Sequence, residues 1–226
     1  MNPFKRKIKH DYVAVRPGNY GWLEHKLNDE EMDFLWKCIE NKQRDVKPLL
    51  AGQIDSSYAL KDPGDWFFNN VVKKVLDAYE KEYGPEVSHS AGKLFPFNGI
   101  PPYYMRMFWV NFQKKHEFNP LHNHTALYSF VVWMKIPTDW KDQRKLKNSK
   151  DTNGQLNSCF MFHYLDLLGN IRAFTYRLSP EDEGTLLFFP GPLHHSVHPF
   201  YECDDDRITI SGNITFNTNK VASNSW

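Results

Sequence analysis

The sequence has few cysteines and no long apolar run. Its three cysteines, Cys38, Cys159 and Cys203, share no spacing typical of metal ligands, and their number is odd. They predict no disulfide framework, as in proteins of the reducing cytoplasm. No stretch approaches the roughly 20 consecutive apolar residues that a membrane span needs, and the start of the sequence has no apolar segment of signal-peptide length. We therefore expect a cytoplasmic protein with no membrane partner.

An excess of charge of either sign is also lacking. Lysine and arginine total 28, aspartate and glutamate total 27, and the net charge is +1 at pH 7. Because the positive and negative charges are nearly equal in number, the protein has no overall field that would attract nucleic acid or an anionic membrane. The short basic stretch Lys5-Arg6-Lys7-Ile8-Lys9 is interpreted as a solvated arm. Nucleic acid is therefore not expected as a partner.

Aromatic residues, by contrast, are abundant. They make up 15% of the 226 residues, with 17 phenylalanines and seven tryptophans. The hydrophobic share of 41% and the charged share of 24% are typical of a soluble globular protein, and the length fits one domain. We expect a broad β core, or a pocket, that is rich in aromatic side chains.

Two helices are predicted in the first 102 residues. Asn28 can cap a helix that ends near Asn41, with Glu31 at the capping-box position three residues later. Asp65 is expected to cap the second helix, which Gly84-Pro85 would end. Apolar residues recur at helical spacing in both segments. Residues 1–27 and the connector 43–63 are expected to be irregular.

From residue 103 onward the periodicity changes from helical to alternating, which predicts strands. The expected strands are 104–112, 127–135, 158–165, 171–178, 185–189 and 207–216. The polar stretch 138–157 is predicted to be a long exposed loop. Because helices come first and strands later, we expect an α+β fold that is mostly β, with the helices packed against an antiparallel sheet or sandwich.

The last predicted strand has two different faces. A strand alternates its faces, so Ile208, Ile210, Ile214 and Phe216 point one way and the polar side chains point the other. The polar residues are Arg207, Thr209, Ser211, Asn213 and Thr215. This face is expected to meet either solvent or the interior of a barrel that holds a polar ligand.

Histidines are concentrated in the same half of the chain. Seven of the ten lie between His116 and His198. His122 and His124 are two residues apart on an extended segment, so both can point to one ion. With one distant histidine they could occupy a face of an octahedral iron site and leave three positions for cosubstrate and oxygen. An arginine would suit the carboxylate of such a cosubstrate, since its planar fork binds carboxylates bidentately.

The order of these motifs resembles that of the iron(II)- and 2-oxoglutarate-dependent oxygenase superfamily, in the branch with a His-x-His segment. The motifs are Trp109-Val110-Asn111, His122-Asn123-His124, Gly184-Thr185-Leu186-Leu187-Phe188-Phe189-Pro190, His195-Ser196-Val197 and Arg207-Ile208-Thr209 with Asn213. The resemblance covers about residues 103–217. It implies a double-stranded β-helix, a jelly-roll or cupin-like sandwich buttressed by helices on one sheet. The expected organisation is one oxygenase domain over residues 1–226, with helical support at 1–102, the β core at 103–217 and a polar tail at 218–226.

The resemblance also implies roles for individual residues. His122 and His195 would be metal ligands, and Arg207 would bind the distal carboxylate of 2-oxoglutarate, with Thr209 as a further donor. The remaining candidates for the pocket are Tyr104, Asn111, Tyr128 and Asn213, and Tyr128 could donate its hydroxyl to a cosubstrate carboxylate. His194 would face away from His195, and His198 is expected at the rim.

The sequence departs from the family pattern at His124, where the superfamily usually has aspartate or glutamate. His124 could itself be a ligand, which would give a three-histidine site. Alternatively, it could be the first ligand, with Ala126 at the carboxylate position and that coordination site open. In the third interpretation His122 is the ligand and His124 only lines the pocket.

The implied function is that of a dioxygenase that uses Fe(II), 2-oxoglutarate and O2 to hydroxylate a small-molecule or peptidyl substrate. Three alternatives are a three-histidine dioxygenase that does not use 2-oxoglutarate, a non-catalytic metal or ligand sensor with the same sandwich, and a zinc-dependent hydrolase. Arg207 argues against the first, and the lack of an evident general base argues against the last. The unusual His124 leaves the sensor open.

Overall fold

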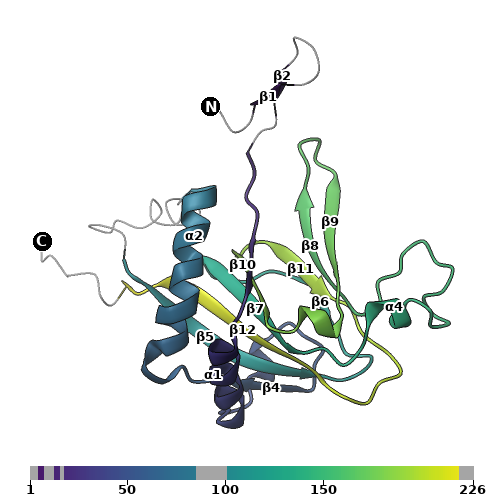
Figure 1. Cartoon of the computed structure of the whole chain (residues 1–226), viewed down its shortest axis with the longest axis horizontal. Coiled ribbons are helices and arrows are strands. Elements are labelled where there is room, and N and C mark those ends of the chain that lie inside the picture. The colour runs from purple at the N-terminus through teal and green to yellow at the C-terminus, as the bar shows by residue number, and fades with distance from the viewer. Residues whose placement is uncertain (1–4, 8–12, 16–17, 85–100, 219–226) are drawn as a thin grey trace, which may run out of the picture.

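The computed structural model describes residues 5–7, 13–15, 18–84 and 101–218 (Figure 1). In these ranges antiparallel sheets dominate and helices are few, so the expected mostly β class is confirmed. None of the helices in them combines the length and the apolar character that a membrane crossing requires. The tail beyond residue 218 and the stretch 85–100, including Pro85 of the predicted stop signal, lie outside the described residues.

The larger sheet has six antiparallel strands. Their order across the sheet is β3 (Leu23–Lys26), β10 (Thr185–Pro190), β7 (Tyr128–Lys135), β12 (Arg207–Phe216), β5 (Tyr103–Gln113) and β4 (Ser56–Ala59). The smaller sheet has four antiparallel strands in the order β6 (Asn119–His122), β11 (His194–Val197), β8 (Cys159–Leu165) and β9 (Ile171–Arg177). A separate ribbon pairs β1 (Lys5–Lys7) with β2 (Val13–Val15).

The strands expected from alternation are found within a few residues of their predicted bounds, as β5, β7, β8, β9, β10 and β12. Six short strands fall in segments for which no strand was predicted, and they are β1, β2, β3, β4, β6 and β11. Each has only three or four residues, which is too short for alternation to stand out. The expectation that residues 1–27 and 43–63 are irregular was therefore wrong at β1, β2, β3 and β4.

The helix α1 (Asp29–Glu40) begins and ends as its sequence predicts. The Asn28 side chain accepts a hydrogen bond from the Glu31 backbone N–H at 3.0 Å, and the Glu31 carboxylate accepts from the Asn28 N–H at 3.0 Å. This capping box satisfies two backbone donors that the first turn would otherwise leave unpaired. Asn41 follows the last turn as the C-cap.

The second helix, α2 (Lys73–Tyr83), is preceded by the 3₁₀ turn η2 (Pro63–Asp65) and by the π-helical segment η3 (Phe68–Val72). The cap differs from the prediction. The Asp62 carboxylate accepts hydrogen bonds from two consecutive backbone N–H groups, those of Phe67 and Phe68, at 2.9 Å each. Asp65 lies in the left-handed region at φ 53° and does not cap. Gly84, at φ 83°, ends the helix.

The stretch 138–157 is only partly an exposed loop. It contains the short helix α4 (Trp140–Gln143), and the Gln143 side chain is buried. The Gln143 amide donates to the Tyr201 carbonyl at 2.8 Å and accepts from the Tyr201 N–H at 2.9 Å. These bonds fix the base of the loop to the segment that precedes β12. The two remaining turns are η1 (Lys47–Leu49) and η4 (Pro180–Asp182).

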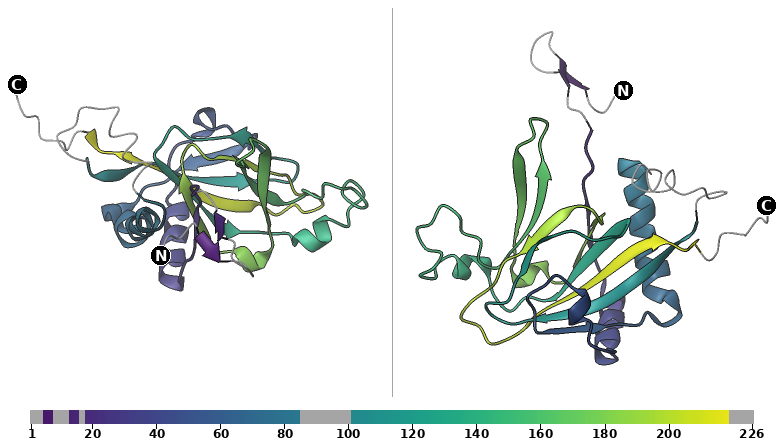
Figure 2. Two further views of the ribbon diagram at one scale, coloured as in Figure 1. Left: turned by 90° about the horizontal axis from the view of Figure 1, so that it is seen from above. Right: turned by 180° about the vertical axis from the view of Figure 1, so that it is seen from behind.

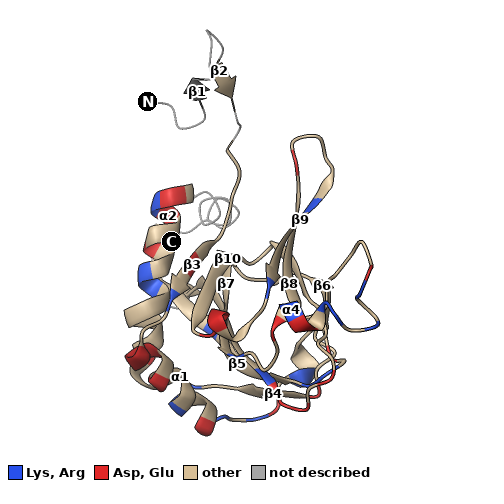
Figure 3. Ribbon diagram, turned by 45° about the vertical axis from the view of Figure 1, so that its right-hand side comes forward, with Lys and Arg blue, Asp and Glu red and all other residues tan. Residues whose placement is uncertain are grey.

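The six-stranded sheet has a different core on each face. Its helix-facing side chains, among them Phe130, Val132 and Ile210, form one cluster with residues of α1 and α2. Val131 and Trp133 point to the other face and pack with Phe160 and Phe162 of the four-stranded sheet. The helices cover one face of the larger sheet (Figure 2), and charged residues of both signs lie along them while most of the sheet surface is uncharged (Figure 3). The space between the two sheets holds the candidate site.

Candidate metal centre

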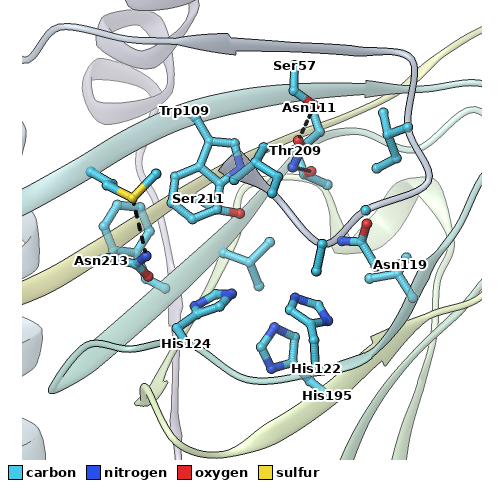
Figure 4. Close-up of a pocket in the computed structure, with 18 of the residues that line it drawn as sticks. Ser57, Trp109, Asn111, Asn119, His122, His124, His195, Thr209, Ser211 and Asn213 are labelled. Carbon is cyan, nitrogen blue, oxygen red and sulfur yellow. Dashed lines mark hydrogen bonds between the residues drawn. The ribbon is translucent and has the colours of Figure 1, made fainter. Parts of the chain in front are cut away.

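Three histidines from separate segments meet between the sheets. His122 ends β6, His124 follows in the next loop, and His195 lies on β11. One ring nitrogen of each lies within 4.8 Å of the corresponding nitrogen of the other two. The ring centroids are 4.3 Å apart for His122 and His195, 5.3 Å for His122 and His124, and 4.9 Å for His124 and His195. Figure 4 shows the three rings grouped on one side of the pocket.

The surroundings of the three rings determine which nitrogen can bind a metal. Nδ1 of His122 lies 2.8 Å from the Pro120 carbonyl oxygen, and Nδ1 of His195 lies 2.9 Å from the Leu193 carbonyl oxygen. A carbonyl oxygen can only accept, so each Nδ1 carries the proton. In both rings the lone pair is therefore on Nε2, the nitrogen that remains available for an ion.

The third ring reaches the same tautomer through a chain of side chains. Nδ1 of His124 lies 2.7 Å from the Ser129 hydroxyl, which in turn donates to the Asn213 amide oxygen at 2.8 Å. Because the hydroxyl proton is used in the second bond, Ser129 accepts from Nδ1–H of His124. Hydrogen bonds of this kind orient metal-binding histidines and fix their tautomer.

The position of His124 depends on a close approach of two loops. The His124 backbone N–H donates to the Gly191 carbonyl at 2.9 Å. An added Cβ on Gly191 would overlap the carbonyl oxygen of Ala126, so only glycine allows this contact without a shift. Ala126 itself packs against Gly191, and it does not belong to the described residues that line the cavity.

Burial keeps the three rings neutral. It lowers the pKa of His122, lowers the pKa of His124 to about 4, and lowers the pKa of His195 to well below the ordinary value. The neighbouring imidazoles shift the pKa of His124 and His195 further in the same direction. A neutral imidazole is the form that binds a metal, so this donor set suits a divalent cation without prior loss of protons.

The rings border a cavity of about 300 Å³. Its opposite wall is built by β5 and β12, which contribute Trp109, Asn111, Ser211 and Asn213 (Figure 4). Of the two interpretations of the polar face of the last strand, solvent or a barrel interior, the structure favours the interior for Arg207, Thr209, Ser211 and Asn213, which all line this cavity. Thr215 is not among the described residues that line it.

Arg207 is fully buried, with 0% of its surface exposed. Its guanidinium donates to the Ser158 hydroxyl at 2.8 Å and, more weakly, to the His198 carbonyl and the Gln113 amide oxygen at 3.4 and 3.5 Å. Nε has no hydrogen-bond partner, and no carboxylate among the described residues pairs with this side chain. Burial lowers its pKa to about 10, so the cation is retained at neutral pH. A buried guanidinium with an unpaired donor fits an anion that enters the cavity.

Two further predicted residues meet on the same wall. The Asn111 amide oxygen accepts from the Ser57 hydroxyl at 2.8 Å, and its amide nitrogen lies 3.4 Å from the Thr209 hydroxyl. Ser57 belongs to β4, which was not predicted to be a strand. Its hydroxyl fixes the orientation of the Asn111 amide, so the NH2 group faces Thr209.

Tyr128 was expected in the pocket, and the structure contradicts this. Its hydroxyl donates to Glu80 of α2 at 3.2 Å, and its ring packs against Tyr79 and Phe188 in the helix-facing core. The neighbouring Ser129 points toward the cavity instead. Every residue from Tyr128 to Met134 is buried, so β7 has no polar face that could have indicated which side meets the pocket.

The other histidines of this region lie outside the cluster. Nε2 of His163 is 3.0 Å from the Ser196 hydroxyl, and neither residue lines the cavity beside the three rings. His194 is exposed, as expected for a neighbour that faces away from His195. His198 is partly buried and contributes its carbonyl, not its ring, to Arg207.

Sequence reasoning missed several residues at the site. Ser129 orients a ring of the cluster, Ser57 orients Asn111, and Ser158 is bonded to Arg207. Arg106 and its neighbour Met107 both line the cavity, whereas successive residues of a strand normally point to opposite faces. Serines have no distinctive spacing, and the signal for Arg106 lies in a strand register that the sequence alone does not display.

Comparison with known proteins agrees with the motifs. Residues 107–213 match the family described as "Putative 2OG-Fe(II) oxygenase". Among curated proteins no match was found.

The comparison with solved structures finds similar chains at low sequence identity, of which three are given. One is an oxidoreductase of the 2OG-Fe(II) oxygenase family from Burkholderia pseudomallei, with 14% identity, a TM-score of 0.36, and coverage of 63% of this chain and 56% of that one. A prolyl-4-hydroxylase from Pseudomonas putida has 13% identity and a TM-score of 0.48, and 88% and 94% of the two chains are covered. HygX from Streptomyces hygroscopicus with iron bound has 11% identity and a TM-score of 0.39, with 88% and 83% covered.

The family match covers the segments that carry the three histidines and Arg207, and those segments hold motifs on which the sequence resemblance was based. The resemblance is thereby confirmed, together with Fe(II) and 2-oxoglutarate as the cofactors of the family. Residues 107–213, which hold the candidate metal centre, are therefore similar to the iron(II)- and 2-oxoglutarate-dependent oxygenases, a superfamily of enzymes.

Proposed function

We propose that this enzyme is a dioxygenase that hydroxylates a C–H bond of a small-molecule or peptidyl substrate, with His122, His124 and His195 as the three protein ligands of iron. The balanced reaction takes one 2-oxoglutarate, one O2 and the substrate to succinate, CO2 and the hydroxylated product. Iron supplies the redox chemistry of that reaction when it is bound, and the protein supplies binding, orientation and shielding from water.

One observation carries the proposal. Each of the three rings has Nδ1 bonded to an acceptor outside the cluster, so each keeps the lone pair of Nε2 for an ion. Three donors held in this way occupy one face of an octahedron and leave three positions open. This favours the three-histidine interpretation over the two in which only one of His122 and His124 is a ligand.

Arg207 would bind the distal carboxylate of 2-oxoglutarate. Its buried cation and its unpaired Nε support this role, because a carboxylate would provide the missing acceptor and the missing negative charge. Thr209 and Asn111 are proposed as further donors to the cosubstrate from the same wall. Asn213 is proposed to act indirectly, through Ser129, on the orientation of His124.

We further propose that the two sheets form the double-stranded β-helix of the superfamily. The pairing of β12 with both β5 and β7, and of β11 with both β6 and β8, supports this architecture. In this proposal residues 1–226 form a single oxygenase domain. Residues 1–102 provide the supporting helices and the strands β3 and β4 at the edges of the larger sheet, residues 103–217 form the rest of the β core, and 218–226 are a tail.

The alternative functions fit the cavity less well. A dioxygenase without 2-oxoglutarate would have no use for a buried, unpaired guanidinium. A zinc-dependent hydrolase needs a general base, and no aspartate or glutamate is among the described residues that line the cavity.

Binding of 2-oxoglutarate to the iron-loaded protein under nitrogen tests the proposal. We expect a weak visible metal-to-ligand charge-transfer band on addition of 2-oxoglutarate. Arg207→Ala should abolish this band at low 2-oxoglutarate, while Arg177→Ala, a substitution on the exposed strand β9, should retain it. Tight zinc binding without any band in the wild type would refute the proposal in favour of a hydrolase or a sensor.

A further inference from the structure

Strand β5 contains a β-bulge opposite β12. Asn213 of β12 pairs with Met107, and the next residue, Ile214, pairs with Met105. Arg106 is therefore the extra residue of the bulge, without a partner of its own in the register. Bulges interrupt the alternation of a strand and redirect a side chain, and they are frequent beside active sites.

This bulge changes the face on which Arg106 lies. Strict alternation would place it with Phe108 and Val110, which belong to the core beneath the helices. Instead, the consecutive residues Arg106 and Met107 both line the cavity, and Met105 packs on the helix side. The break in alternation thus brings a cationic side chain into the cavity wall.

The cavity contains an unusual set of charges. Among the described residues that line the cavity, Arg106 and Arg207 are the only ones with a charged side chain, and no carboxylate stands among them. Arg106 is exposed, so it lies where the cavity opens to solvent. Its guanidinium makes no hydrogen bond or ion pair with a side chain in the part of the chain that the structure describes.

The proposed function leaves this positive charge unbalanced. The two charges of 2-oxoglutarate balance those of iron(II), and the three imidazoles are neutral. In the ligand set usual for the superfamily, a carboxylate provides one more negative charge at the metal. The neutral imidazole of His124 stands in its place and provides none. The net positive charge of the two guanidinium groups then remains in a cavity without acidic side chains among the described residues. Because Arg207 is assigned to the distal carboxylate of 2-oxoglutarate, Arg106 is the group free to bind an additional anion.

We propose that the substrate carries a carboxylate or phosphate group and that Arg106 binds this group at the entrance of the cavity. The inference rests on the proposed function and names the class of substrate. With the anion held by Arg106, the body of the substrate would extend toward the histidines past Met107 and Trp109, which line the same wall. These apolar neighbours suit an acid with an apolar or aromatic body.

Matched probes test this proposal by calorimetry on the iron-loaded protein with 2-oxoglutarate under nitrogen. The probes are 3-phenylpropionate, the neutral 3-phenylpropionamide and phenyl phosphate. We expect at least one of the two anions to bind about tenfold more tightly than the amide, as for a hydrogen bond to a charged group. Which anion binds more tightly distinguishes a carboxylate site from a phosphate site.

Arg106→Gln should remove this preference for an anion, and Arg106→Lys should keep part of it. Arg44→Gln, at another exposed arginine, is the matched control and should keep all of it. Equal affinity for anions and amide, no saturable binding of either anion at millimolar concentration, or an anion preference that survives in Arg106→Gln would overturn the proposal. The 2-oxoglutarate band is recorded first in each protein, so its absence in the wild type would refute the proposed function separately.

Discussion

His122 and His195 stand directly opposite each other as cross-strand partners of β6 and β11, with ring centroids 4.3 Å apart. Two histidines that are distant in the sequence are therefore brought together by strand pairing and not by a flexible loop. Side chains directly opposite in an antiparallel pair have their Cβ atoms about 4.5–5.5 Å apart, so the register itself brings both rings to one side of the site. His124 then joins them from the loop that follows β6.

Removal of any one of the three rings should cost the protein its iron. We expect His122→Ala, His124→Ala and His195→Ala to contain little iron after anaerobic loading and desalting, as measured by atomic emission. His163→Ala is the matched control, since its ring is bonded to Ser196 outside the cavity, and it should load normally. Full iron content in His124→Ala would reduce that residue to a pocket wall.

A carboxylate at position 124 should be accepted in place of the imidazole. His124→Asp restores the ligand type usual in the superfamily, so we expect it to bind iron better than His124→Ala and to form the 2-oxoglutarate band. The band should also shift in energy, because the anionic ligand makes the site one unit less positive. If His124→Asp and His124→Ala were alike in iron content, a ligand role for this position would be excluded.

Ser129 is expected to act on the metal through His124. Ser129→Ala removes the acceptor of Nδ1–H, which frees the ring to rotate or change tautomer. Loss of such a supporting bond weakens metal affinity about tenfold to hundredfold. Competition with a chelator measures this, with Ser211→Ala, a serine of the cavity wall with no bond to the rings, as the control. Unchanged affinity in Ser129→Ala would show that the orientation of His124 is set by packing alone.

Arg207 should reduce the stability of the protein when no cosubstrate is bound. A buried cation without a carboxylate is unfavourable, so we expect Arg207→Met to raise the free energy of unfolding of the ligand-free protein by about 1 kcal/mol. With iron present, 2-oxoglutarate at a hundredfold excess over its Kd should raise the free energy of unfolding of the wild type by about 2.7 kcal/mol. The same addition should leave the free energy of unfolding of Arg207→Met unchanged. Urea unfolding with and without ligand measures both effects. A destabilised variant that still responds to 2-oxoglutarate would contradict the role of Arg207.

Several features of the site could be predicted because they depend on local chemistry. The capping box at Asn28 and Glu31 needs only four residues of sequence, and the polar face of β12 follows from alternation. The convergence of His122, His124 and His195 was anticipated from the motifs of a family. In each case the signal lies within one segment or in the order of segments.

What could not be predicted depends on register between strands. The bulge that turns Arg106 into the cavity exists only relative to β12. Ser129 could not be found because its role follows from its pairing with Asn213 across β7 and β12. Tyr128 was misplaced because both faces of β7 are apolar. Alternation within one strand gives no information about which face a neighbouring sheet will cover.

The cap of the second helix offers a test of the fold. The Asp62 carboxylate accepts hydrogen bonds from two backbone N–H groups, so Asp62→Ala should lower the free energy of unfolding by about 1 kcal/mol. Asp65→Asn, which keeps a residue tolerant of the left-handed conformation, should change it by less than about 0.5 kcal/mol. Denaturant unfolding measures both variants. A larger loss in Asp65→Asn than in Asp62→Ala would reverse the assignment of the cap.

The most direct test of the three-histidine iron site is diffraction from crystals of the iron(II)-loaded protein, with anomalous scattering recorded at the iron edge. We predict a single peak bonded by Nε2 of His122, His124 and His195, with Nδ1 of each ring still bonded to its present partner. A peak elsewhere, or one that only two of these rings reach, would contradict the account.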